Sequence, residues 1–372
     1  MRIQTFRFPD RFFTGMKNFS PYAGYNTLFF EKFKSKIAKK NMFYAFAGGR
    51  ISFFSEKSIV FSLRNAPLCD TVSPEERFNS VWRKFQMSEE SLPETMFPFK
   101  KHYFEQRGVK VHYTDEGSGP VILLFHACPM WSFSFRHLIA ELSTDHRVIA
   151  FDLPGFGLST KNPDGDYTLD GYINLTENFI DFLGLQNMTF ILHGWGGTVG
   201  MGYAVRHPKK INALIIMNSM AFSDYALPWR LKLCRFPGLG KWITIHFGLK
   251  LFRNDAVHPR KLAEIYNAPY QNYEDRIALY HFAIDIPTVP EADSAQKILE
   301  IETGLWMFRS SPALILWAAK DWLYPPRLLK RWRRYLPKAE TELIPKAGRF
   351  MMEEQTEVIR DKVRSFLAKH QL

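Results

Sequence analysis

The stretch TFILHGWGGTVGMGYAVRHP, residues 189–208, decides the fold of this chain. Thr189–Leu192 is a short apolar run typical of a buried strand, and Thr198–Arg206 is predicted to continue as a helix. The residues between them, His193–Gly197, have the pattern of a nucleophile elbow, a tight turn that points its central side chain at a pocket. The central residue is Gly194, so this elbow supplies no side chain that could react.

Strand and helix alternate on both sides of this stretch. The other predicted strands are His102–Glu105, Val109–Tyr113, Val121–Phe125, Arg147–Phe151, Ala213–Met217, Ala313–Trp317 and Glu340–Ile344. The other predicted helices are Phe133–Leu142, Gly171–Leu183, Pro326–Leu336 and Glu354–Ala368. This alternation implies right-handed crossovers, and therefore an α/β fold with a mostly parallel, doubly wound sheet.

The alternation stops in the middle of the chain. Residues 223–303 are rich in aromatic residues, helical in character and without a strong buried strand. We therefore predict a core formed by residues 98–222 and 304–372, with residues 223–303 inserted as a helical lid. Ligands bind a doubly wound sheet at the carboxyl ends of its strands, so a lid there would close over a pocket.

Residues 1–97 are predicted to be a separate, basic and Phe-rich extension. The chain carries a net charge of +12, and residues 1–64 contain twelve Lys and Arg against Asp10, Glu31 and Glu56. Such a balance fits peripheral contact of residues 1–64 with an anionic membrane surface, or simply a solvated basic face. Nucleic acid is not an expected partner, because no nucleic-acid-binding motif accompanies the charge. Phe29–Lys40 could form short amphipathic helices.

Cysteine usage and hydropathy indicate the compartment. Cys69, Cys128 and Cys234 are scattered and odd in number, which argues against a disulfide framework and for a reducing compartment. No run of eighteen apolar residues is present, so we expect no transmembrane helix and a cytoplasmic location. Organellar targeting is the alternative, because the N-terminus is poor in acids and contains Arg, Phe and Ser. No metal spacing is present, and no cofactor is expected.

Several segments resemble one known family. They are Pro98–Gly119 (PFKKHYFEQRGVKVHYTDEGSG), His126–Arg136 (HACPMWSFSFR), Phe151–Ser159 (FDLPGFGLS) and His193–Pro208 (HGWGGTVGMGYAVRHP). Together they resemble the haloalkane dehalogenases of the α/β-hydrolase fold, nearest the branch that includes the β-lactone decarboxylase of bacterial olefin-forming pathways. The resemblance runs from Pro98 to Leu372 and leaves residues 1–95 unmatched.

The resemblance implies a set of site residues, several of which are replaced here. The family pattern has an Asp nucleophile where this chain has Gly194, and a His base where it has Arg349. It has an Asn where this chain has Cys128. Asp321 matches the acid of the triad, and Trp195 matches an N–H donor that holds a leaving halide or an oxyanion. The resemblance also implies a Gly at the position of Ala127.

These replacements predict that the family's chemistry is absent. Without a carboxylate at position 194 no alkyl-enzyme ester can form. A guanidinium stays protonated, so Arg349 cannot act as a base. We expect Arg349 and Asp321 to form an ion pair that lines the old site. The alternative is that Arg349 extends to solvent and Asp321 caps the start of a helix.

Other residues around the elbow have more than one interpretation. Trp195, Cys128, His126, Trp131 and Arg349 are the expected ligand-binding residues, around a small apolar or anionic molecule. His193 and Cys128 could instead be a displaced base and nucleophile, although a lone loop Cys is more often an inert small hydrophobe. Asp152 resembles a residue that orders its loop.

The sequence is therefore consistent with three functions. The first is a ligand-binding pseudoenzyme of the dehalogenase-like family with a degenerate catalytic triad. The second is an active hydrolase with rearranged catalytic residues. The third is a scaffold that docks to a membrane or a partner through its basic N-terminal extension. Fold alone does not decide among them.

Overall fold

The computed structural model describes residues 43–47, 50–55, 58–64, 96–252, 260–287 and 292–372. The chain divides into two compact units, Met1–Ser80 and Val81–Leu372.

The first unit contains a three-stranded antiparallel sheet in the order β1-β2-β3. Its strands are β1 (Phe43–Ala47), β2 (Arg50–Ser55) and β3 (Ser58–Arg64). These strands were not predicted from the sequence, because their periodicity is weak. One feature of the sequence did point to them. Only two residues separate each strand from the next, Gly48-Gly49 and then Glu56-Lys57, and two-residue connections are common between antiparallel strands. The proposed helices at Phe29–Lys40 lie outside the described residues.

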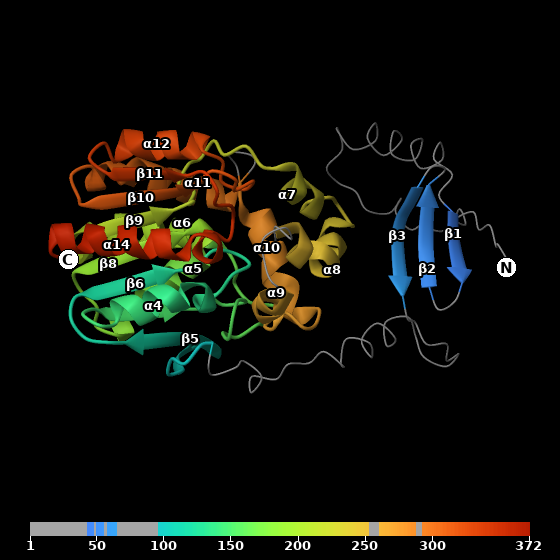
Figure 1. Ribbon diagram of the computed structural model, residues 1–372, viewed down its shortest axis with the longest axis horizontal. Coiled ribbons are helices and arrows are strands. Elements are labelled where there is room, and N and C mark those ends of the chain that lie inside the picture. The colour runs from blue at the N-terminus through green and yellow to red at the C-terminus, as the bar shows by residue number, and fades with distance from the viewer. Residues whose placement is uncertain (1–42, 48–49, 56–57, 65–95, 253–259, 288–291) are drawn as a thin grey trace. The chain divides into compact units, whose positions relative to one another are not determined.

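The second unit is built on an eight-stranded sheet in the order β11-β10-β9-β8-β6-β7-β5-β4 (Figure 1). Its strands are β4 (His102–Gln106), β5 (Val109–Glu116), β6 (Val121–Phe125), β7 (Arg147–Phe151), β8 (Met188–His193), β9 (Ile211–Met217), β10 (Ala313–Ala318) and β11 (Glu340–Ile344). The pairings β4·β5 and β5·β7 are antiparallel, and all the others are parallel. The predicted α/β-hydrolase fold with a mostly parallel sheet is confirmed.

Strand β6 shows why the apolar runs become central strands. Leu123 and Phe125 belong to one apolar cluster, and Ile122 and Leu124 belong to the other. Because side chains alternate along a strand, a strand covered on both faces must be apolar at every position. The two clusters therefore lie on opposite faces of the sheet.

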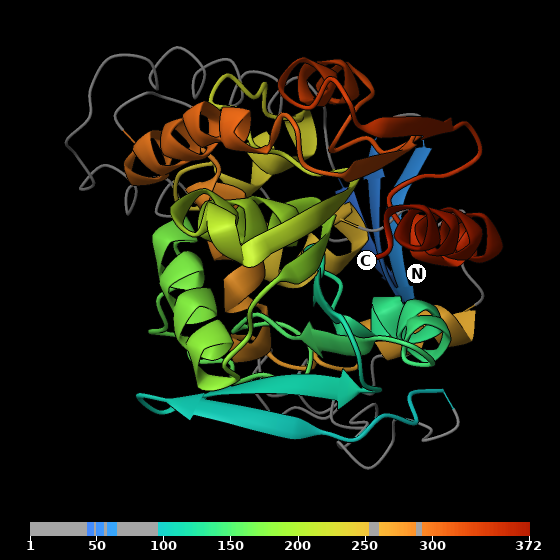
Figure 2. The same cartoon turned by 90° about the vertical axis from the view of Figure 1, so that its left-hand side faces the viewer.

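Helices complete both layers, with α5 and α6 (green) on one side of the strands and α4 and α14 on the other (Figure 2). The core helices are η2 (Ser132–Phe135), α4 (Arg136–Leu142), α5 (Leu169–Phe182), α6 (Gly194–Arg206), η3 (Pro208–Lys210), α12 (Arg327–Tyr335), α13 (Met351–Glu354) and α14 (Thr356–His370). Most predicted boundaries lie within a few residues of these. Helix α6 begins earlier, at Gly194, because the elbow itself forms its first turn.

Between β9 and β10 the described residues form helices and no strand. These helices are α7 (Trp229–Cys234), α8 (Gly240–Phe252), α9 (Arg260–Asn267), η4 (Glu274–Arg276), α10 (Ile277–Asp285), α11 (Asp293–Gly304) and η5 (Leu305–Phe308). Helix α10 contacts both α7 and α8, and Figure 1 shows these two on the side of α10 that faces away from the sheet. In the part of the chain that the structure describes, no helix combines the length and the hydropathy needed to cross a bilayer.

Candidate functional site

The turn from β8 to α6 has the geometry of an elbow. Strand β8 ends at His193, and Gly194 follows with φ +58°, a left-handed conformation in which a side chain is strained. A Cβ atom added at Gly194 would lie 2.5 Å from the Cβ of Ala127 and 3.6 Å from the ring Cε2 of Tyr324. The methyl group of Ala127 therefore fills the space in which a side chain at position 194 would begin.

The loop after β6 is held against this elbow through the backbone. The N–H of Gly196 donates to the carbonyl of His126 at 3.1 Å. A Cβ at Gly196 would lie 2.2 Å from that same carbonyl oxygen, so only Gly allows this approach. The loops after β6 and β8 therefore meet at the carboxyl edge of the sheet.

Arg349, in the loop after β11, reaches into the same place. Its side chain is 1% exposed, and its Nη2 donates to the carbonyl oxygen of Cys128. Its Nη1 lies 3.7 Å from Oδ2 of Asp321. The predicted ion pair is thus confirmed, but 3.7 Å is too long for a hydrogen bond, so the two side chains attract each other without forming one.

The two carboxylate oxygens of Asp321 have different surroundings. Oδ1 accepts the N–H of Leu323 at 2.8 Å and that of Tyr324 at 3.3 Å, so it orders its own loop. Oδ2 faces Arg349 and has no hydrogen-bond partner. Burial raises the pKa of this carboxyl, and the attraction of Arg349 offsets only part of that effect.

Several buried polar atoms at the elbow and the neighbouring loops have no hydrogen-bond partner among the described residues. They include Nε and Nη1 of Arg349, Oδ2 of Asp321, Nε1 of Trp195 and the hydroxyl of Tyr324. Native proteins satisfy nearly all such atoms, because leaving one unsatisfied costs about 1–3 kcal/mol. Donors and acceptors are therefore available here to a small polar group.

Cys128 and His193 do not have the properties of a nucleophile and its base. Burial raises the pKa of the Cys128 thiol well above its usual value, although Arg349 opposes this shift. Burial, and then the charge of Arg349, lowers the pKa of His193 to about 3. No hydrogen bond joins the two side chains among the described contacts. A neutral thiol without a base beside it is a poor nucleophile.

Two of the expected ligand-binding residues have other contacts. Nε2 of His126 accepts the N–H of Leu153 at 3.0 Å, which leaves Nδ1–H to donate to the carbonyl of Ala127 at 3.1 Å. Both nitrogens are thereby used by the backbone, so His126 has a structural role. The described ring contacts of Trp131 are with Phe97 and Phe133, and none joins it to Arg349 or Trp195.

Asp152 has the role that the sequence suggested. Its Oδ1 accepts the N–H of Ser132 at 2.7 Å. Its Oδ2 accepts the N–H of Leu158 and lies 2.9 Å from Nδ1 of His112. Burial alone would raise its pKa, but the bond from His112 and the other interactions hold the pKa below its usual value.

Two aromatic residues beside Arg349 were not predicted from the sequence to be site residues. The guanidinium carbon of Arg349 lies 5.6 Å from the ring centroid of Tyr324 and 5.9 Å from that of Trp322. Both belong to the loop Ala319–Tyr324, which follows β10. A signal for them was present, because they immediately follow Asp321 and share its loop.

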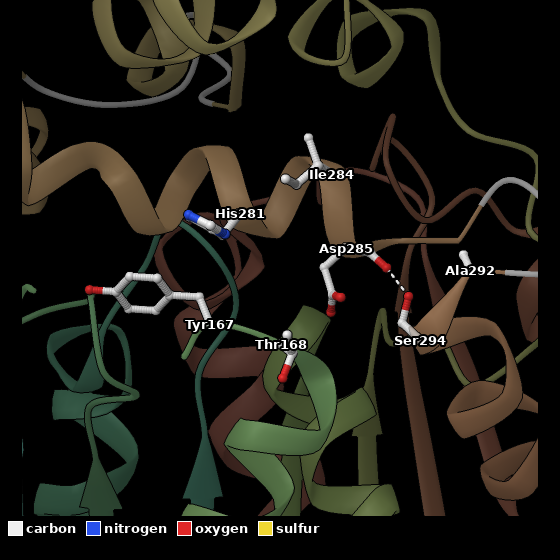
Figure 3. A pocket seen from close by; sticks show the side chains of 7 residues that line it. All are labelled: Tyr167, Thr168, His281, Ile284, Asp285, Ala292 and Ser294. Atoms are coloured by element: carbon white, nitrogen blue, oxygen red, sulfur yellow. Dashed lines mark hydrogen bonds between the residues drawn. The ribbon is translucent and has the colours of Figure 1, made fainter. Parts of the chain in front are cut away.

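A surface cleft of about 400 Å³ lies against α10, away from the expected residues (Figure 3). It is lined by Tyr167, Thr168, His281, Ile284, Asp285, Ala292 and Ser294. The pocket predicted from Trp195, Cys128, His126, Trp131 and Arg349 is therefore not the cleft seen here.

The carboxyl group in this cleft has a structural task. Asp285 accepts the N–H of Leu169 at the start of α5, and burial raises its pKa to about 6. The neighbouring residue Phe282 packs edge-on against Trp195, with ring centroids 5.5 Å apart. Helix α10 thus contacts the elbow on one side and the cleft on the other.

The sequence is similar to a known family over most of its length. Residues 120–356 match the family model for the alpha/beta hydrolase fold. The cis-3-alkyl-4-alkyloxetan-2-one decarboxylase of Shewanella oneidensis is 32% identical over 290 residues, which cover 74% of this chain and 91% of that protein. A haloalkane dehalogenase of Psychrobacter cryohalolentis is 30% identical over 249 residues, or 62% of this chain and 78% of that protein.

Solved structures agree with this similarity. The haloalkane dehalogenase DatA of Agrobacterium tumefaciens superposes with a TM-score of 0.65 at 25% sequence identity. The superposition covers 73% of this chain and 97% of that one.

Proposed function

Because the chain belongs to the α/β-hydrolase family, and within it to the haloalkane dehalogenase and oxetanone decarboxylase type, we propose that it is a ligand-binding pseudoenzyme. The observation that carries the proposal is the contact between Ala127 and Gly194. The residue in the nucleophile position has no side chain, and a neighbouring methyl group occupies the space for one. A site that had only lost its nucleophile would keep that space.

The proposed loss extends to the proton-transfer step. In covalent catalysis of this type a side chain first attacks the substrate, and a base then activates water to release it. Gly194 offers no attacking atom. Arg349 is the residue in the base position, and its guanidinium remains protonated at any working pH. Asp321 faces that guanidinium and has no imidazole to orient.

The unpartnered atoms suggest the chemistry of the ligand. Arg349 and Trp195 present N–H groups that suit a carboxylate or carbonyl oxygen, and Oδ2 of Asp321 presents an acceptor that suits a hydroxyl group. The surrounding side chains are apolar, including Phe282 beside Trp195. We therefore propose a small hydroxy acid with an apolar chain as the ligand. The related decarboxylase acts on an oxetan-2-one with two alkyl groups, and opening such a lactone ring with water gives a hydroxy acid of this kind.

Calorimetric titration of the full chain tests the proposal. A 3-hydroxyalkanoate should bind wild type, and Arg349→Met should weaken binding at least tenfold because it removes the charged donors. Arg136→Met is the matched control. Arg136 is also a largely buried Arg, but both of its terminal nitrogens donate to Glu353, at 2.5 and 2.7 Å. Equal affinity in wild type and Arg349→Met, or no binding at millimolar ligand, would contradict the proposal.

The rival function is an active hydrolase with rearranged residues, and turnover decides it. We expect wild type to leave haloalkanes, aryl esters and β-lactones unchanged. Turnover that Cys128→Ala abolishes would establish the rival. Restoring the family pattern needs Gly194→Asp, Arg349→His and Cys128→Asn together with Ala127→Gly, because the methyl of Ala127 stands in the way of the new side chain. Activity that appears only in this fourfold variant would support the pseudoenzyme.

A further inference from the structure

Helices α7 and α8 carry a group of exposed apolar side chains that neither the fold nor the elbow explains. Trp229 and Leu233 on α7, Leu239 in the turn and Trp242 on α8 are between 39% and 66% exposed. Gly240 lies against the carbonyl oxygen of Cys234, so the start of α8 is held beside the end of α7. The four side chains therefore belong to one small region. Together with Lys232 and Lys241 they form what we call the α7–α8 patch.

The patch is apolar and basic at once. Lys232 and Lys241 are exposed and alternate with the apolar side chains along the sequence. Neither forms an ion pair with any residue that the structure describes. From Tyr225 to Phe252 the sequence contains five Lys and Arg, namely Arg230, Lys232, Arg235, Lys241 and Lys250, and no Asp or Glu. The elements packed against α8 carry acids, namely Glu274 and Asp275 in η4 and Asp285 at the end of α10. Nζ of Lys241 lies 5.7 Å from the ring centroid of Tyr273, which directly precedes η4.

We propose that the α7–α8 patch docks the protein on an anionic lipid surface. Trp is favoured where one side of a residue meets acyl chains and the other meets water, and Lys beside it is attracted to anionic headgroups. Interfacial helices carry this combination of Trp, Leu and Lys. A second copy of the chain is disfavoured as the occupant, because two basic patches would repel each other. Residues 1–64 are disfavoured for the same reason, since they carry twelve Lys and Arg against three acids.

The proposal goes beyond the proposed ligand and does not depend on it. One contact links the two regions: the guanidinium carbon of Arg230 on α7 lies 4.7 Å from the ring centroid of Trp322, which also contacts Arg349. A surface that draws the protein to lipids would bring ligands with apolar chains near this side of the molecule.

Vesicle co-sedimentation of the full chain tests the docking surface. Wild type should bind vesicles of phosphatidylcholine with phosphatidylserine, bind pure phosphatidylcholine weakly, and bind less in high salt. Trp229→Ala with Trp242→Ala should lower the partition coefficient at least tenfold. Each of Lys232→Glu and Lys241→Glu should lower it at least about fivefold, the equivalent of about 1 kcal/mol for one cation at such a surface.

The control is Trp306→Ala. Trp306 in η5 is 50% exposed and has an Arg beside its ring, like Trp229, but it lies outside the patch. This variant should bind as wild type does, and all the substituted residues are exposed, so circular dichroism should show unchanged folds. The proposal is overturned if wild type does not bind anionic vesicles. It is also overturned if binding survives the Trp229→Ala, Trp242→Ala double change, which would place the contact on residues 1–64.

Discussion

Two buried aspartates stand at the same edge of the sheet, and their surroundings are opposite. Asp152 follows β7, and both of its oxygens have hydrogen-bond donors, from Ser132, Leu158 and His112. Asp321 follows β10, and one of its oxygens has only a guanidinium at 3.7 Å. The pKa of the first carboxyl is held below its usual value, and that of the second is raised. A buried carboxyl group with all its hydrogen bonds made is typical of one that holds loops in place. A buried carboxyl group with an unsatisfied oxygen is typical of a functional site.

The largest effect is expected at the complete network. Asp152→Ala leaves two backbone N–H groups and His112 without their acceptor, so the free energy of unfolding should fall by about 5 kcal/mol. Urea denaturation measures it. Asp115→Ala is the control, because Asp115 holds a part-exposed pair with Arg147 and should cost only about 1 kcal/mol. A loss at Asp152 no larger than at Asp115 would remove the basis of the comparison.

The next effect concerns the incomplete pair. Asp321→Leu leaves the buried guanidinium of Arg349 unpaired, and should lower the free energy of unfolding by about 4 kcal/mol. Adding Arg349→Met should restore only part of that loss, because it removes the unpaired buried charge but leaves the N–H groups of Leu323 and Tyr324 without their acceptor. Denaturation of both variants measures the recovery. No recovery in the double variant would mean that Asp321, like Asp152, mainly holds its loop in place.

A third test addresses the elbow. Gly194→Ala adds a Cβ at positive φ and against the methyl of Ala127, and should cost about 3 kcal/mol. Gly184→Ala is the matched control, because Gly184 has φ +61° and nothing within 4 Å of an added Cβ, so it bears only the conformational cost of about 1 kcal/mol. Combining Gly194→Ala with Ala127→Gly should show a favourable coupling of about 1 kcal/mol. Strict additivity would exclude the proposed contact.

The smallest effect is a dependence on pH. His193 has a pKa of about 3 in the folded protein because it is buried beside Arg349, and about 6.5 in the unfolded chain. The unfolded chain therefore binds the proton first, and stability is lost as the pH falls below about 6.5. At pH 5 this loss should reach about 2 kcal/mol. His193→Gln should flatten the curve of unfolding free energy between pH 7 and 5, and an unchanged slope would show that other groups cause it.

The sequence predicted the main strands and the positions of the loops that follow them. Val121–Phe125 and Arg147–Phe151 were predicted with the observed bounds, because strands covered on both faces are apolar throughout. The Asp321–Arg349 pair was predicted from the resemblance, which implies that the acid lies beside the residue in the base position. The contacts of Ala127 with Gly194 and of Tyr324 with Arg349 were not, because they depend on distances between loops. Strands β1–β3 were missed because the periodicity of their sequences is weak.

The packing of Ala127 on Gly194 makes two positions of the chain depend on each other. Any side chain at the elbow would begin 2.5 Å from the methyl group of Ala127, so the two residues have to be exchanged together to be accommodated without strain. A designer who wishes to place a reactive group at this turn must therefore treat the pair as one unit, and a screen of single substitutions would miss it.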